Sequence, residues 1–284
     1  MNELNFKQEL TGVFGQPISE NPSQAMVEAA YRHHNLDWRY ITMEVDADGL
    51  EAAVNGAKAM GFRGFNCTLP HKVAVIQHLD GLGESAAVME AVNCVVRKED
   101  GRWIGENTDG KGFLESLETV GSPAEANVII LGAGGAARAI AVELALAGAR
   151  QVTIINRSAE RGQALVDLIA ERTPAKAVFQ ALDGEIVVPE DCGIFINATN
   201  IGLFPDVDSR VPVALTSLRP GLIVADVIPN PLRTHLVEEA EAAGCTVLDG
   251  LGMLVNQGRI GIKYWTGIEP DTDAMRRALE EVFS

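Results

Sequence analysis

Apolar runs that indicate buried strands alternate with segments of helical spacing along most of the chain. The clearest run, residues 128–131 of an expected strand 127–131, leads directly into the glycine turn 132–135, and an Ala-rich helical pattern then continues to about Ala147, where Gly148 ends it. An unbroken apolar run is typical of a strand buried on both faces. The order strand, glycine turn and helix opens a dinucleotide-binding fold, in which a pyrophosphate contacts free N–H groups at the helix N-terminus.

The glycine turn supplies the first candidate binding residues. Ala137 occupies the place of the third glycine in a Gly-x-Gly-x-x-Gly pattern. A small residue is sufficient there because this position packs the helix against the strand. We predict a nucleotide site, the alternative being a structural glycine turn in another kind of α/β protein. The cofactor-binding residues predicted from the turn are Gly132, Gly134, Gly135 and Ala136.

The second half of the chain repeats the strand and helix alternation. Further apolar strands are expected at 152–155, 194–196, 222–225 and 246–248, with helices near 136–147, 158–172 and 233–243. Such alternation favours a parallel, doubly wound sheet of Rossmann type, whose ligand lies at the carboxyl ends of the strands.

The first half has its own β-α-β-α-β order. Strands are expected to end near 13–15, to span 40–45 and to begin at Gly64, with helices from Ser23 and over 50–60. A strand at 91–96 and a hairpin to 103–105 follow, and two helices at 252–265 and 271–282 have no strand to return to. We predict a two-domain α/β protein, with domains 1–110 and 111–251 and with residues 252–284 completing the first.

Composition and charge narrow the class of partner. The 284 residues are 47% hydrophobic and carry a formal net charge of −16, which argues against nucleic acid or an anionic membrane as the main partner. The chain contains neither a signal-peptide pattern nor an apolar run long enough to span a bilayer, so we expect a cytoplasmic protein. The expected partner is a small-molecule substrate, and the oligomeric state stays open, a homodimer being one candidate.

The four cysteines do not indicate a metal or redox site. They are Cys67, Cys94, Cys192 and Cys245, all in apolar surroundings, and none forms a Cys-x-x-Cys pair. We expect reduced, buried thiols and no bound metal.

Polar clusters follow the strands of the second half and bear on the choice of cofactor. Asn156-Arg157-Ser158 lies about 20 residues past the glycine turn, where an acidic residue would bind the ribose of NAD and an arginine suits the 2′-phosphate of NADP. Arg157, with Arg161 one helical turn on, suits that phosphate, although Arg157 stacked on the adenine would serve either cofactor. Thr199 and Asn200 belong to the next cluster, and helix caps are the alternative explanation for such residues.

Lys72 and Asn93 are the most informative polar residues of the first half. Lys72 is expected in the first turn of a helix, where a lysine is uncommon unless an anion or a reaction requires it. The alternative is a solvated lysine. Asn93 stands in an apolar strand, and an unpaired buried amide would cost about 1–3 kcal/mol.

Taken together, these motifs resemble the shikimate dehydrogenase family along nearly the whole chain. The segments that carry the resemblance, in the family's order, are 13–18, 66–72, 91–93, 107–110, 132–138, 156–158, 197–199 and 249–257. The resemblance implies an N-terminal substrate-binding and catalytic domain, a C-terminal NAD(P)-binding domain and a role in aromatic amino acid biosynthesis.

The resemblance also implies roles for individual residues. Lys72 and Asp109 match the family's catalytic pair. Thr68, Asn93 and Gln257 match ligands of the substrate's ring hydroxyls, and Gly250 and Met253 match neighbours of the nicotinamide. Hydride transfer from a secondary alcohol requires removal of the hydroxyl proton, which a lysine can accept if burial depresses its pKa, while a nearby aspartate opposes that shift.

Two positions depart from the family where it binds the substrate carboxylate. Asn21-Pro22-Ser23 replaces a Ser-x-Ser pair, and Pro229 stands where a tyrosine commonly assists. We expect Asn21 and Ser23 to contact the substrate. Loss of a hydroxyl–carboxylate bond costs about 1.5–3 kcal/mol, or roughly 10–150-fold in affinity. A third difference, Asn200 in place of a common serine, would crowd a 2′-phosphate and opposes the slight preference for NADP.

Two functional hypotheses follow. The first is an oxidoreductase that transfers a hydride between NAD(P) and a cyclic polyol acid, namely shikimate, quinate or an amino-substituted relative. The second is a cofactor-binding regulatory or sensor protein with little turnover, suggested by the same substitutions. The retention of Lys72 and Asp109 favours the enzyme.

Overall fold

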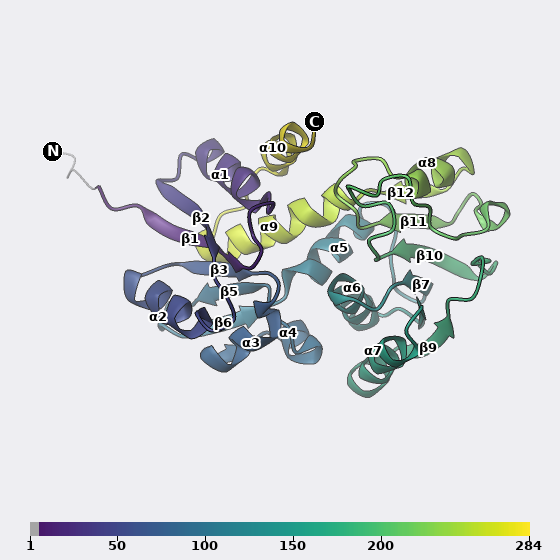
Figure 1. Cartoon of the computed structure of the whole chain (residues 1–284), viewed down its shortest axis with the longest axis horizontal. Helices are drawn as coiled ribbons and strands as arrows, with labels where there is room; N and C mark the ends of the chain where they lie inside the picture. The colour runs from purple at the N-terminus through teal and green to yellow at the C-terminus, as the bar shows by residue number, and fades with distance from the viewer. Residues whose placement is uncertain (1–5) are drawn as a thin grey trace. The chain divides into compact units, whose positions relative to one another are not determined.

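The computed structural model describes residues 6–284 and divides into two compact units (Figure 1). The first unit contains the residues up to Thr108 together with Gly258–Val282, and the second contains Asp109–Gln257. The predicted two-domain α/β class is confirmed by the two sheets, one in each compact unit. In the part of the chain that the structure describes, no helix combines the length and apolar character needed to cross a membrane.

The first unit is built on a mixed six-stranded sheet with the order β2-β1-β3-β5-β6-β4. Strands β1, β2 and β3 are parallel, and β5 runs antiparallel to both β3 and β6. Its elements are β1 (Glu9–Gly15), α1 (Ser23–His33), β2 (Trp38–Glu44), α2 (Leu50–Met60), β3 (Gly64–Cys67), α3 (His71–Ala74), β4 (Gly81–Leu82), α4 (Glu84–Met89), β5 (Cys94–Arg97) and β6 (Trp103–Glu106).

Both faces of this sheet are covered. The buried side of α2 packs with Phe14 and Phe65 in one core. On the other side, α1 meets the C-terminal helices α9 (Gly250–Thr266) and α10 (Thr272–Phe283), because a methyl group added at Gly258 would meet Met26 of α1 and Met275 of α10. The first compact unit includes α10 and the part of α9 from Gly258 onward.

The second unit is a doubly wound parallel sheet with the order β12-β11-β10-β7-β8-β9. Its core clusters place α6 and α7 on one face and α8 on the other, as Figure 1 also shows. The strand order reverses between β7 and β10, which is where such sheets bind ligands. The elements are α5 (Thr108–Glu118), β7 (Asn127–Leu131), α6 (Gly135–Leu146), β8 (Gln151–Asn156), α7 (Ala159–Arg172), β9 (Lys176–Ala181), β10 (Cys192–Asn197), β11 (Ile223–Asp226), α8 (His235–Ala242) and β12 (Thr246–Leu248).

Three expectations need correction. Asn93 lies just before β5 rather than inside it. The edge strand β9 was not predicted, because its residues are exposed or half-buried and its sequence lacks an unbroken apolar run. All four cysteines are free thiols, but Cys245 is only partly buried.

Candidate active site

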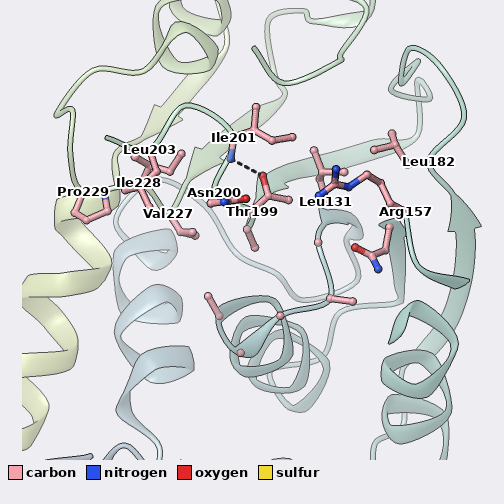
Figure 2. A pocket seen from close by; sticks show the side chains of 17 residues that line it. Leu131, Arg157, Leu182, Thr199, Asn200, Ile201, Leu203, Val227, Ile228 and Pro229 are labelled. Atoms are coloured by element: carbon pink, nitrogen blue, oxygen red, sulfur yellow. Dashed lines mark hydrogen bonds between the residues drawn. The ribbon is translucent and has the colours of Figure 1, made fainter. Parts of the chain in front are cut away.

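A cavity of about 430 Å³ lies at the carboxyl ends of β7, β8 and β10 in the second unit. It contains eight of the predicted cofactor residues. Those eight are Gly132, Gly134, Gly135, Ala136, Asn156, Arg157, Thr199 and Asn200. In Figure 2, Arg157 and Leu182 lie at one end of the cavity, and Leu203, Ile228 and Pro229 lie at the other.

The glycine turn has the backbone geometry of a phosphate cradle. Gly132 has φ +118°, and a methyl group added there would lie 2.7 Å from the Ala198 carbonyl oxygen, so both conformation and space require glycine. At Gly134, which caps α6, an added methyl would meet open space among the described residues. Ala137 is fully buried in the core, as its packing role requires. The turn lines the cavity at the N-terminus of α6, which is the positive end of the helix dipole. This position suits the negative pyrophosphate of a dinucleotide.

The segment after β8 divides its residues between binding and structure. Arg157 is exposed and lines the cavity, so its guanidinium is available to a ribose phosphate or an adenine ring. The Asn156 amide donates to the Ser158 carbonyl oxygen at 2.9 Å, which holds the loop. The Ser158 hydroxyl accepts from the Arg161 N–H and caps α7, and the Arg161 side chain is exposed on that helix. The cap explanation therefore accounts for Ser158.

Thr199 orders the loop that follows β10. Its hydroxyl donates to the Asn197 side-chain oxygen at 2.7 Å and accepts from the Ile201 N–H at 3.1 Å, as Figure 2 shows for the second bond. Asn200 in the same loop is exposed at the cavity. This wall is thus held by a turn of side-chain hydrogen bonds.

Asp226 anchors the loop that carries the opposite wall. Its carboxylate accepts from the Asn197 amide at 3.0 Å, from the Ile228 N–H at 3.2 Å and from the Thr234 hydroxyl at 2.7 Å. The side chain is 2% exposed, and this burial raises its pKa from 3.8 to about 6, against the lowering effect of the three donors.

This raised pKa predicts a stability change with pH. Between pH 4 and 6 the folded state retains the Asp226 proton that the unfolded state has lost, so stability falls as pH rises through this window. We expect the free energy of unfolding of Asp226→Asn, relative to the wild type, to rise by about 3 kcal/mol from pH 4 to pH 7. Urea unfolding measures this difference, with Asp167→Asn on exposed α7 as control. A difference independent of pH would contradict the assignment.

The predicted catalytic lysine lies in the first unit. Lys72 is half-buried on the short helix α3, and its carbonyl oxygen accepts from the Val92 N–H at 2.7 Å. Burial raises the pKa of the Cys67 thiol, at the end of β3, to about 12. The positive charge of Lys72 lowers that pKa in part, so the lysine charge acts at the end of β3. Thr68 precedes it, with a methyl group so close to Gly15 that a Cβ added there would lie 2.3 Å away.

Asn93, Asn21 and Ser23 are also fixed within the first unit. Asn93 is 3% exposed, and its amide group donates to the Thr108 hydroxyl at 3.0 Å while its side-chain oxygen accepts from the Thr108 N–H at 2.7 Å. The Asn21 side-chain oxygen accepts from the Ser23 N–H at 2.9 Å. The remaining polar group of the Asn21 amide, its NH₂, is the one with which it can donate to a substrate.

The other predicted residues lie in the second unit. Asp109 is half-buried in the first turn of α5. Gln257 is buried, and a Cβ added at Gly112 of α5 would lie 2.5 Å from its backbone nitrogen. Gly250 begins α9 against the cavity wall, because its Cβ would lie 2.2 Å from the Ile228 carbonyl oxygen, and Met253 packs against the core one turn later.

Sequence reasoning missed the apolar part of the cavity lining. Leu182 follows the unpredicted strand β9, and Leu203 and Ile228 come from loops rather than from periodic segments. Their positions depend on the turns held by Thr199 and Asp226. Only the rule that ligands lie beyond the carboxyl ends of strands pointed to these loops.

A second cavity, of about 440 Å³, lies in the first unit near Arg63 and Arg97. Arg63 immediately precedes β3 and Arg97 ends the antiparallel strand β5, so this cavity is at the opposite end of the sheet from Thr68 and Asn93. The C-terminal ends of α2 and α9 border it. Cations are favourable beside helix C-termini, which accounts for the basic residues there.

A parallel sheet with a glycine cradle at its switch point defines a dinucleotide-binding class of protein, and family comparison makes the class specific. The model of the shikimate dehydrogenase substrate binding domain matches residues 13–95, that of shikimate / quinate 5-dehydrogenase matches 115–200, and that of the shikimate 5'-dehydrogenase C-terminal domain matches 250–280. The chain belongs to the shikimate dehydrogenase family, as its motifs predicted.

Three relatives illustrate the likeness over the full length. The shikimate dehydrogenase (NADP(+)) of Methanocaldococcus jannaschii is 38% identical, over 97% of this chain and 98% of its own. The ligand-free 5-ketofructose reductase of Gluconobacter sp. strain CHM43 is 55% identical with a TM-score of 0.96, covering 98% of this chain and 100% of its own. Shikimate 5-dehydrogenase from Listeria monocytogenes in complex with shikimate and NAD is 32% identical with a TM-score of 0.90, covering 98% and 99%.

Proposed function

We propose that this protein is an NAD(P)-dependent oxidoreductase that transfers a hydride between the nicotinamide and a CH–OH group of a polyhydroxylated substrate. The shikimate dehydrogenases among its relatives support this activity on a substrate of shikimate or quinate type. One observation carries the proposal: the chain has both a glycine cradle and a partly buried lysine. The cradle is at Gly132 and Gly134 in the second unit, and half-buried Lys72 follows the carboxyl end of β3 in the first. We assign the first unit to the substrate and the second to the cofactor.

The residues of the chain divide the work. A bound nicotinamide accepts or supplies the hydride. Lys72 accepts the hydroxyl proton when the alcohol is oxidised and returns a proton when the ketone is reduced, with Asp109 as its charged partner. Thr68, Asn93 and Gln257 orient the hydroxyl groups of the substrate by hydrogen bonds. The N–H groups at the start of α6 hold the pyrophosphate.

We propose NADP as the preferred cofactor. Arg157 lines the cavity beside Asn156, and its guanidinium can form charge-assisted bonds to a 2′-phosphate. The relative from Methanocaldococcus jannaschii carries NADP in its name, whereas the structure from Listeria monocytogenes contains NAD. Titration of the protein with NADPH and with NADH, followed by the fluorescence of the reduced nicotinamide, measures the preference directly.

A substrate panel tests the reaction. Shikimate, quinate and aminoshikimate are each incubated with NADP+ or NAD+, and hydride transfer is followed at 340 nm. Turnover of any one of them supports the proposed acid substrate. If none of these acids and no keto-sugar of the 5-ketofructose type is turned over in either direction, the proposed activity is wrong and the sensor hypothesis remains.

A second candidate substrate is a neutral keto-sugar of the 5-ketofructose type. The relative of that name shares 55% of its residues with this chain, against 38% for the shikimate dehydrogenase from Methanocaldococcus jannaschii. The sequence departs from the family at Asn21 and Pro229, where hydroxyl groups commonly bind a carboxylate. A substrate without a carboxylate makes no use of those hydroxyls.

We therefore expect kcat/KM for reduction of 5-ketofructose to exceed kcat/KM for oxidation of shikimate by at least tenfold. Asn21→Ser should raise kcat/KM for shikimate about tenfold, because one hydroxyl–carboxylate bond is regained. Serine can also accept from the Ser23 N–H, so the turn before α1 is retained. Gln24→Ser, exposed on the same helix, is the matched control. A shikimate rate unchanged by Asn21→Ser would show that this position does not contact the carboxylate.

We further propose that the enzyme works in the cytoplasm; its oligomeric state stays open, with a homodimer as one candidate. The net charge of −16 supports a protein that does not bind anionic membranes. Size-exclusion chromatography with light scattering measures the oligomeric state, and cell fractionation measures the location.

A further inference from the structure

The second cavity of the first unit contains two arginines whose backbones are bonded to each other. Arg63 precedes β3 and Arg97 ends β5, and the Arg97 N–H donates to the Arg63 carbonyl oxygen at 3.1 Å. Both side chains are exposed and line the cavity, and we call them the arginine pair. The cavity volume of about 440 Å³ lies within the range of roughly 300–1,000 Å³ that is usual for small-molecule sites.

The guanidinium groups of the arginine pair keep most of their donors. Arg63 uses its Nε to donate to the Glu9 carboxylate at 2.8 Å, and the Lys7 ammonium lies 3.9 Å from the same carboxylate. The Arg97 side chain makes no hydrogen bond or ion pair with any of the described residues. Its charge acts on Glu9 only at longer range, because the hydrogen bond from Arg63 and, after it, the charge of Arg97 lower the pKa of Glu9.

The helix ends beside the cavity do not use these donors either. At the end of α2, the Gly61 N–H donates to the Lys58 carbonyl oxygen, and at the end of α9 the Gly267 N–H donates to the Lys263 carbonyl oxygen. Within residues 6–284 the arginine pair donates no side-chain hydrogen bond to a helix carbonyl group. The helix dipoles therefore explain why positive charge is favourable here, but they leave the guanidinium donors unused.

The number of free donors indicates a phosphoryl group as the ligand. A single carboxylate has two oxygens, which one guanidinium fork already matches. A phosphoryl group has three acceptor oxygens and a charge of about −1.5 to −2 at pH 7, so it can bond to two guanidinium groups at once. Because the whole chain carries a net charge of −16, a site for such an anion requires cations gathered locally, as they are in this cavity.

We propose that the arginine pair is a second ligand site, which binds the phosphoryl group of a small phosphorylated molecule. The organic part of that molecule occupies the rest of the cavity, where Tyr264 supplies an apolar wall. All lining residues belong to the first unit, at the opposite end of the sheet from Thr68 and Asn93, so the site is separate from the expected substrate residues. The inference goes beyond the proposed function and does not depend on it.

Isothermal titration calorimetry with glucose 6-phosphate tests the proposal, and Arg97→Gln is the decisive variant. We expect a wild-type Kd of about 1 mM or lower at physiological ionic strength, and a Kd at least about tenfold higher in Arg97→Gln, because charge-assisted bonds are lost. Arg97→Lys keeps the charge but not the fork and should give an intermediate Kd. Since the Arg97 side chain has no bonds to lose, the Tm of Arg97→Gln should stay within about 2 °C of the wild type.

Arg277→Gln is the matched control, because Arg277 is exposed on α10 and lies outside the cavity. It removes the same charge from the first unit, and its Kd should stay within about twofold of the wild type, since a distant exposed charge is screened. Phosphate binding at the glycine turn would be common to all of these variants and would not alter the comparison.

Three results would overturn the proposal. They are the absence of wild-type binding, the same Kd in Arg97→Gln as in the wild type, and an equal rise in Arg277→Gln. A parallel titration with succinate checks the ligand class, and succinate bound as tightly as glucose 6-phosphate would overturn the assignment to a phosphoryl group. A protein inactive on the substrate panel would contradict the proposed function but leave this site standing, because the calorimetry measures no turnover.

Discussion

We expect Lys72→Met to lower kcat by about 10²–10⁴-fold and to leave the Kd for NADPH unchanged, because the proposed role of Lys72 is to carry the hydroxyl proton. Methionine is an unbranched apolar side chain of nearly the same length, so it replaces the lysine stem while the ammonium group is lost. The hydride cannot leave a secondary alcohol at a useful rate unless the hydroxyl proton leaves as well. Stopped-flow or steady-state absorbance at 340 nm gives kcat, and fluorescence titration gives the Kd.

The control for this variant is Lys98→Met in the same unit. Lys98 is exposed and lines the second cavity of the first unit, near Arg63 and Arg97. Its ammonium lies 5.8 Å from the centre of the Tyr264 ring. We expect its kcat to match the wild type. If Lys72→Met also kept more than half of the wild-type kcat, Lys72 would be a solvated lysine and the sensor hypothesis would gain weight.

Asp109→Asn, alone and combined with Lys72→Met, tests whether Lys72 and Asp109 act as one catalytic unit. Groups that act as one unit are not additive in their effects on rate. We therefore expect the double variant Lys72→Met/Asp109→Asn to have a kcat close to that of Lys72→Met alone. Additive losses would separate the two residues into independent roles.

The sequence predicted those helices and strands whose burial produces a regular pattern of apolar residues. Strand β7 is apolar at Val128, Ile129, Ile130 and Leu131 because both of its faces are covered, and α2 was predicted with its observed bounds. Strand β9 was missed because an edge strand satisfies one side with solvent and needs no such run. The two-residue strand β4 and the helix α4 are too short for any periodicity to appear.

The site residues also fall into those that the sequence could single out and those that it could not. Gly132 and Lys72 could be singled out because local geometry and charge at a helix start restrict the residue types that fit there. Tyr40 could not, since a tyrosine in a strand is an ordinary residue until β2 and β3 are placed on either side of β1 and its hydroxyl meets the Asn66 side chain. Their hydrogen bond spans 26 positions in the chain, and a single sequence contains no signal for it.

Gly134→Ala and Gly132→Ala should separate cofactor binding from fold stability. At Gly134 the backbone has φ −87° and the added methyl meets open space in the described structure, so Tm should stay within about 2 °C of the wild type. The same methyl would stand where a bound pyrophosphate approaches the backbone in this kind of fold, and we expect the Kd for NADPH to rise about 100-fold, or about 2.7 kcal/mol. Differential scanning fluorimetry and fluorescence titration measure the two quantities.

Gly132→Ala should lower both stability and affinity. Its φ of +118° is unfavourable for any residue with a Cβ, and the methyl would be 2.7 Å from the Ala198 carbonyl oxygen at the end of β10. Backbone atoms at that distance must move, so the β7 and β10 ends that frame the cavity shift with them. We expect a loss of about 2–3 kcal/mol in the free energy of unfolding. Equal Tm values for the two variants would contradict this division, because the methyl at Gly134 has no atom of the described residues within 4 Å, whereas the methyl at Gly132 lies 2.7 Å from the Ala198 carbonyl oxygen.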